Sequence, residues 1–144
     1  MSNKWVVVFG GAGFLGSNLC KSLLNNGKKV ICIDNLYTGN LKNIEPFQDN
    51  KNLLYFNHDV TEKWTTDLEL EAIYNLACPA SPFHYQKNPI YTLKINFNGA
   101  LNVLELAEKH NVSVFQASTS EIYGDPQEHP QVEKYLGNVK RVTN

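Results

Sequence analysis

The sequence has few cysteines and no clustered histidines, and both absences exclude classes of protein. Cys20, Cys32 and Cys78 form no CxxC pair, and their odd number argues against a disulfide framework. The four histidines are scattered without metal-ligand spacing, so we expect no metal site. This cysteine usage favours a reducing compartment, and we expect a cytoplasmic protein.

The sequence also has almost no net charge and no long apolar run. Its formal net charge is −1, so it lacks the basic footprint of a protein that binds nucleic acid or an anionic membrane. The first apolar run, "WVVVF", is shorter than the core of a signal peptide. No later run approaches the length of a membrane span. We therefore expect neither nucleic acid nor membrane as a partner.

Strand and helix patterns alternate along the chain. Unbroken apolar, β-branched runs predict buried strands, and Leu15, Leu19 and Leu23 recur every four residues, as on one face of a helix. The expected strands are residues 4–10, 28–34, 52–59, 70–77 and 112–118. This alternation predicts an α/β fold: a doubly wound parallel sheet with helices on both faces, in one domain.

The segments between these strands differ in character. Residues 35–50 are polar and rich in turn formers, which predicts a loop with at most one short helix. Residues 81–89, "SPFHYQKNP", are also predicted to be a loop. From residue 89 to 109, apolar residues at helical spacing predict an amphipathic helix of about six turns.

The stretch "FGGAGFLG" places Gly10, Gly13 and Gly16 between a predicted strand and a predicted helix. In a dinucleotide-binding loop the first glycine permits a tight turn. The second lets the backbone approach a pyrophosphate, and the third lets the helix pack close to the sheet. Three glycines that serve only a turn are the alternative. Further along, Asp34 ends the second predicted strand, where a carboxylate can accept hydrogen bonds from a ribose 2′-hydroxyl. No arginine follows in "DNLYTG", so the pattern predicts NAD rather than NADP.

Longer motifs resemble the extended short-chain dehydrogenase/reductase family, the NAD-dependent epimerases and dehydratases of nucleotide sugars, which have a Rossmann fold. The resemblance is carried by "GGAGFLG", "IDNLYTGNLKNI", "NHDV", "YNLACPASPFHYQKNPIYTLKINFNGALNVLELA" and "ASTSEIYGDPQEHPQ". These motifs are most similar to the UDP-glucuronate decarboxylase branch, which makes UDP-xylose. The family usually has threonine where Phe9 stands and serine where Cys78 stands.

Two other branches of the family match less well. The 4,6-dehydratases carry an aspartate between the threonine and the glutamate of "STSE", and this chain has Ser120 there. The 4-epimerases lack the glutamate that stands here as Glu121. In the decarboxylase branch, NAD oxidises the sugar at C4, carbon dioxide leaves from C6, and the ketone is then reduced. The resemblance implies that Thr119 hydrogen-bonds the C4 oxygen and that Ser120 and Glu121 lie near the carboxylate. For the hydroxyl residues, capping of a turn is the alternative.

The resemblance also implies a set of cofactor and substrate contacts. The expected cofactor-binding residues are Gly10, Gly13, Phe14, Leu15, Gly16, Asp34, Asn35, Thr38, Gly39, Asp59, Val60, Leu76, Ala77, Cys78 and Ala117. The expected UDP-sugar contacts are Lys94, Asn102 and Tyr85. The alternatives are a solvated helix lysine for Lys94, a helix-surface asparagine for Asn102 and a buried, inert thiol for Cys78.

The family's catalytic base is a tyrosine followed by a lysine four residues later, and no tyrosine of this sequence has such a lysine. The resemblance places that motif just beyond Asn144, so we expect an incomplete, truncated NAD-binding Rossmann domain over residues 1–144, inactive alone. A non-catalytic NAD-binding regulatory or assembly module is the alternative. The fifth strand would form an exposed sheet edge, so we expect association with a second copy or a partner subunit through that edge or through helix 89–109.

Overall fold

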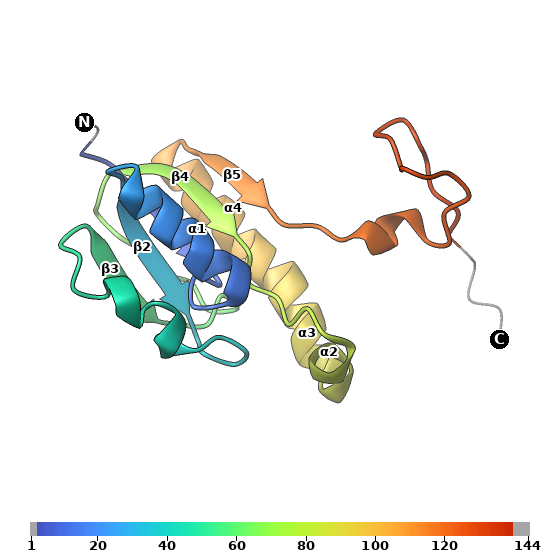
Figure 1. Cartoon of the computed structure of the whole chain (residues 1–144), viewed down its shortest axis with the longest axis horizontal. Coiled ribbons are helices and arrows are strands. Elements are labelled where there is room, and N and C mark those ends of the chain that lie inside the picture. Colours follow the sequence, from blue (N-terminus) through green and yellow to red (C-terminus); the bar gives the residue numbers. More distant parts are fainter. Residues whose placement is uncertain (1–2, 140–144) are drawn as a thin grey trace.

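The computed structural model describes residues 3–139 and shows one parallel five-stranded sheet with helices on both faces (Figure 1). The strands lie in the order β3-β2-β1-β4-β5, so the chain moves outward from β1 to β3 and then returns to the other side of β1. This is the predicted Rossmann-like, doubly wound arrangement. The strands are β1 (Trp5–Phe9), β2 (Lys29–Asp34), β3 (Leu53–Asn57), β4 (Leu70–Asn75) and β5 (Ser113–Gln116).

The apolar strands supply two cores because successive side chains point to opposite faces of the sheet. On one face, Val6 and Val8 pack with Cys20 and Leu24 of α1 (Phe14–Asn25). On the other face, Val7 packs with residues of α4 (Ala100–His110), and the side chain of Phe9 lies edge-on to Trp64. Both faces are buried, which explains why the strands read as unbroken apolar runs.

The helical segments differ from the prediction in two of the loops and in the long helix, which is described in the next paragraph. Residues 35–50 contain two short 3₁₀ turns, Leu41–Asn43 and Glu45–Phe47, rather than at most one helix. The predicted loop 81–89 contains a short helix, α2 (Pro82–Lys87). Helix α2 begins there because Pro82 suits the first helical position and the Ser81 carbonyl accepts hydrogen bonds from the backbone N–H groups of His84 and Tyr85.

The long helix is present but is not uniform. It consists of α3 (Pro89–Lys94), a π-helical turn over Ile95–Gly99, and α4. The wide turn lies where the helix approaches the end of β3. A Cβ at Gly99 would come within 2.9 Å of Val60 Cγ1, so a larger residue there would displace the Val60 side chain.

Beyond β5 the chain leaves the body as an arm that ends in a small folded tip (Figure 1). The tip is held by stacked rings of Tyr123 and Tyr135, whose centroids lie 5.9 Å apart, and by a bridge between Gly124 and Asn138. Strand β5 is the edge of the sheet, as predicted, and Phe115 on it is 56% exposed. Within residues 3–139 no helix is long and apolar enough to cross a membrane, and no cluster of His, Cys, Asp or Glu could hold a metal ion.

Candidate functional site

A cleft of about 960 Å³ lies at the carboxyl ends of the strands. Its walls come from the loop after β1, the ends of β2, β3 and β4, helix α2 and the segment after β5. Strands are added to one side of β1 up to β3 and to its other side from β4 onward, so the strand order switches between β1 and β4. Ligands of open α/β sheets bind outside the strand ends at such a switch point. The position of the cleft therefore follows from the topology.

The glycine loop forms the floor of this cleft, and each of its glycines has a different geometry. Gly10 has a φ of +75°, and a Cβ there would lie 2.8 Å from the carbonyl carbon of Leu76. A Cβ on Gly16 would lie 2.0 Å from the Gly10 oxygen, so helix α1 can begin this close to β1 only with glycine. Gly13 is looser, because its nearest contact would be 3.2 Å. A Cβ on Gly13 would require the Gly10 oxygen to shift by only a few tenths of an ångström, and Gly13 lines the cleft.

Two thiols lie buried beneath the same loop. A Cβ on Gly11 would come within 2.5 Å of Cys32 Sγ, so the loop rests directly on that sulfur. The contact with Cys20 and burial raise the pKa of Cys32, and both thiols are free. Both side chains pack beneath the loop, and Cys32 remains a neutral thiol.

Asp34 ends β2 and joins the glycine loop to the next loop. Its Oδ2 accepts a hydrogen bond from the Ala12 backbone N–H at 2.9 Å, and its Oδ1 accepts one from the Leu36 N–H at 2.8 Å. Leu36 has a φ of 61°, a left-handed conformation that is uncommon for a leucine. Gly39 packs against the same carboxylate, since a Cβ there would lie 2.7 Å from Oδ1. Asp34 thus lines the cleft and also ties two loops together.

A hydrogen-bond network connects the ends of β2 and β3 with helix α3. The Asp59 carboxylate accepts hydrogen bonds from the Asn35 amide at 2.9 Å and from the Tyr91 hydroxyl. Burial acts to raise the pKa of Asp59, but the hydrogen bonds from Tyr91, Thr61 and Asn35 together hold it below its usual value. Burial and the neighbouring Asp59 raise the pKa of Tyr91 to about 12. Asp59 is therefore the ionised acceptor and Tyr91 the neutral donor.

The ends of β4 and β5 form the opposite wall. The buried Asn75 donates from Nδ2 to Gln116 Oε1 at 2.9 Å, and its carbonyl accepts from the Ala117 N–H at 3.0 Å. This pair fixes where the chain leaves β5. Leu76, Ala77 and Cys78 follow β4 and line the cleft. Cys78 is exposed rather than a buried, inert thiol, and its sulfur lies 3.6 Å from the Asn96 side chain.

The segment "ASTSE" after β5 places part of its polar groups on the cleft. Ala117, Ser118, Thr119 and Glu121 line it, whereas Ser120 does not. Thr119 Oγ1 accepts a hydrogen bond from the Glu121 N–H at 3.2 Å and so caps the short helix Ser120–Tyr123. Thr119 therefore caps a turn, which was the alternative to a role in catalysis. Its hydroxyl proton is still available to donate to a ligand.

Most of the sequence-predicted residues meet at this one cleft, but four do not line it: Ser120, described above, and Lys94, Asn102 and Gly39. Lys94 is exposed on α3, as expected of a solvated helix lysine. Asn102 lies behind the wall, where its Nδ2 donates to the Val60 carbonyl at 2.9 Å. Gly39 lies behind Asp34. Sequence reasoning missed wall residues that come from several elements, namely Tyr37, His58, Asn75, Asn96 and Gln116.

The sheet order, the glycine loop at a helix N-terminus and the acidic residue ending β2 define an α/β protein of the Rossmann type, the fold used by dinucleotide-binding domains. The model of the NAD dependent epimerase/dehydratase family matches residues 6–142, and the chain belongs to this family. UDP-glucuronic acid decarboxylase 4 of Arabidopsis thaliana is 49% identical over 95% of this chain and 30% of its own length. UDP-glucuronic acid decarboxylase 1 of Xenopus tropicalis is 45% identical over 96% of this chain and 32% of its own.

Solved structures agree with this placement. A UDP-N-acetylglucosamine 4-epimerase from Methanobrevibacter ruminantium, in complex with UDP-N-acetylmuramic acid, is 28% identical with a TM-score of 0.81 and covers 96% of this chain and 45% of its own. The Thermus thermophilus UDP-glucose 4-epimerase, in complex with NAD, is 29% identical with a TM-score of 0.77. The match covers 92% of this chain and 43% of the epimerase. The chain thus spans about a third of the length of the decarboxylases quoted and under half of these epimerases.

Proposed function

We propose that this chain binds NAD as the nucleotide-binding part of a nucleotide-sugar enzyme resembling UDP-glucuronate decarboxylase. The observation that carries the proposal is the convergence on one cleft of the glycine loop, the Asp34 carboxylate and the Thr119–Glu121 segment. The cleft also suits a dinucleotide because Gly13 presents backbone without a side chain to it.

Each wall would hold a different part of the cofactor. The first N–H groups of α1 have no partner within the helix, and together with Gly13 they would hold the pyrophosphate. Asp34 would accept from the adenosine ribose through lone pairs that its two backbone donors leave free. When bound, NAD would supply hydride transfer. Thr119 and Glu121 lie on the cleft wall after β5, where they would orient a sugar hydroxyl and carboxylate.

The decarboxylase branch is favoured by two observations. Ser120 stands where the 4,6-dehydratases carry an aspartate, and both curated relatives reported above, at 49% and 45% identity, are UDP-glucuronic acid decarboxylases. UDP-glucuronate is therefore the proposed substrate of the enzyme to which this nucleotide-binding part would belong.

The sequence contains no tyrosine with a lysine four residues later, so we propose cofactor binding without turnover by these 144 residues alone. The same observation supports a second candidate, a non-catalytic NAD-binding module that assembles with another chain.

A calorimetric titration of the chain with NAD and NADP tests the proposal. We expect saturable binding of NAD and at least about tenfold weaker binding of NADP, because Asp34 repels a 2′-phosphate. A Gly13→Ala variant should keep its fold and lose most of its NAD affinity, because the added methyl group would crowd the loop backbone that is proposed to hold the pyrophosphate. An absence of NAD binding, or equal binding to Gly13→Ala, would contradict the proposal.

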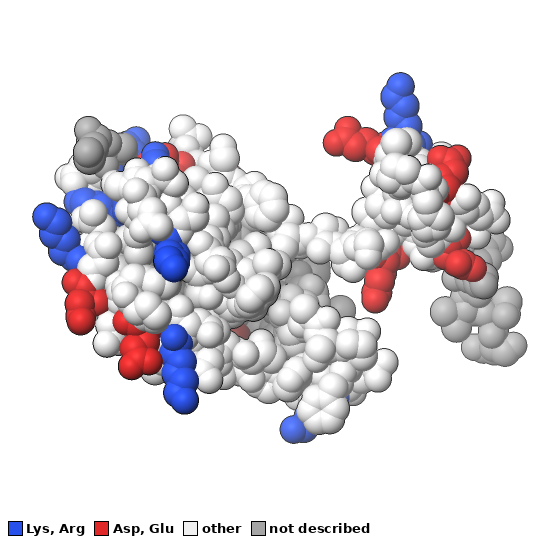
Figure 2. Space-filling view, viewed as in Figure 1, with Lys and Arg blue, Asp and Glu red and all other residues white. Residues whose placement is uncertain are grey.

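We also propose that a second copy of the chain packs on the long helix. Ile90, Leu93, Phe97, Leu101 and Leu104 are all at least 47% exposed. Ile90 and Leu104 each lie seven residues from Phe97, and Leu93 and Leu101 each lie four from it. This symmetric spacing suits an antiparallel pair of identical helices around a two-fold axis at Phe97. Figure 2 shows charged residues mainly on the side of β2 and β3 and on the arm, with few between them.

Light scattering across a concentration series measures this association. We expect a dimer for the parent chain and at least about tenfold weaker dimerisation for Phe97→Lys, because two lysines would face each other at the axis. Leu68→Lys, which changes an exposed leucine before β4, should dimerise like the parent. A parent chain that stays monomeric at high concentration would refute a dimer on this helix.

A further inference from the structure

Tyr91 does not line the cleft, yet it contacts three residues that do. Its hydroxyl donates to Asp59 Oδ2 and accepts a hydrogen bond from Asn35 Nδ2 at 2.8 Å. Its ring lies edge-on to the ring of Tyr37, with centroids 5.5 Å apart. Tyr91 therefore acts on the cleft wall from behind, from helix α3.

The groups that Tyr91 holds have almost no remaining freedom. Asn35 Oδ1 accepts from the Tyr37 N–H at 3.0 Å, while its Nδ2 serves both Asp59 and Tyr91. Asp59 Oδ1 accepts from the N–H and the hydroxyl of Thr61, both at 2.8 Å. A carboxylate has about four acceptor positions, and all of them are used here. The network gives Asn35 and Asp59 one orientation each.

We propose that Tyr91 is a positioning residue for the adenosine end of the cleft. It holds Asn35, Asp59 and Tyr37 in place, across the ends of β2 and β3, without touching the dinucleotide. The inference rests on the proposed NAD binding, which places the adenosine ribose at the neighbouring Asp34. Wall groups that are ordered before the ligand arrives need not be immobilised during binding, so the affinity rises.

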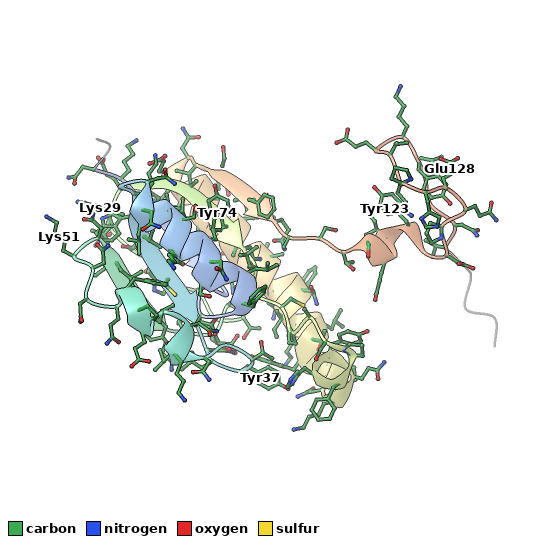
Figure 3. All side chains as sticks on the ribbon, in the orientation of Figure 1. Lys29, Tyr37, Lys51, Tyr74, Tyr123 and Glu128 are labelled. Atoms are coloured by element: carbon green, nitrogen blue, oxygen red, sulfur yellow. The ribbon has the colours of Figure 1, made fainter. Side chains whose placement is uncertain are left out.

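The hydroxyl of Tyr91 carries the role, and Tyr91→Phe removes it while keeping the ring. Tyr74→Phe is the matched control, because Tyr74 lies on β4 in the body of the sheet, apart from Tyr37 and away from the cleft wall (Figure 3). The probes are NAD, ADP and nicotinamide mononucleotide, each titrated calorimetrically. We expect about tenfold weaker binding of NAD and ADP to Tyr91→Phe and an unchanged affinity for nicotinamide mononucleotide. Tyr74→Phe should bind all three like the parent.

The same network offers a second, milder variant if Tyr91→Phe fails to fold. Thr61→Val removes one of the four donors to Asp59 without a change of shape, and should weaken ADP binding by a few-fold. Unchanged ADP affinity in the folded variants, or an equal loss for nicotinamide mononucleotide, would overturn the positioning role. A parent chain that binds neither NAD nor ADP would instead overturn the proposed function, and this inference with it.

Discussion

Replacing Gly16 with alanine is expected to lower the free energy of unfolding by about 3 kcal/mol or more. The new Cβ would lie 2.0 Å from the Gly10 oxygen and 2.8 Å from both the Gly10 carbonyl carbon and the Gly11 Cα, so it meets backbone rather than a flexible side chain. Gly10 lies close to the Leu76 backbone, since even an added Cβ on Gly10 would come within 2.8 Å of it, so Gly10 has little room to yield. Helix α1 would have to separate from β1. Urea denaturation followed by circular dichroism measures the loss.

Gly13→Ala is the matched control for this experiment. Gly13 has a φ of −73°, which any residue can adopt, and an added Cβ would come no closer than 3.2 Å to the Gly10 oxygen. We expect the free energy of unfolding to change by less than about 1 kcal/mol, the cost of alanine at a helix N-cap. If Gly16→Ala proved as stable as Gly13→Ala, the close approach of α1 to β1 would not hold the loop.

Replacing Asp34 with alanine is expected to destabilise the chain even in the absence of any nucleotide. The substitution leaves the Ala12 N–H, which is buried, and the Leu36 N–H without an acceptor. Each unsatisfied donor costs about 1–3 kcal/mol, so a loss of about 2–6 kcal/mol in the free energy of unfolding follows for the two. Leu36 also loses the partner that holds its left-handed backbone. Thermal and urea denaturation of the nucleotide-free chain measure the effect.

Two further variants separate this structural role from ligand binding. Asp34→Asn keeps one acceptor oxygen and should fall between the parent chain and Asp34→Ala in stability. Asp67→Ala removes a carboxylate from an exposed loop and should leave the stability unchanged. An Asp34→Ala chain as stable as the parent, but without NAD binding, would mean that the carboxylate serves only the ligand. Loss of NAD binding by Asp34→Ala therefore has to be judged against its stability.

Local signals in the sequence were sufficient for the sheet and for the positions of the glycine loop and Asp34. Buried parallel strands read as unbroken apolar runs, and glycine and proline mark their ends, so the five strands were predicted to within two residues at each end. Right-handed crossovers left only a few topologies open, and the structure shows which strand order the chain adopts. The short helix α2 was missed because its only signals are Ser81 and Pro82, which also occur in loops.

The tertiary structure alone decided which side chains reach the cleft. Asn102 and Lys94 lie on the same long helix as cleft residues such as Asn96, but the π-helical turn and the contact with Val60 determine which side of that helix faces the cleft. The network of Asn35, Asp59 and Tyr91 joins residues up to 56 positions apart, and no local pattern indicates it. The sequence by itself determined the fold and the glycine loop, because these depend on periodicity and backbone freedom. The arrangement of polar side chains depends on packing between distant segments, and only the folded chain brings those segments together.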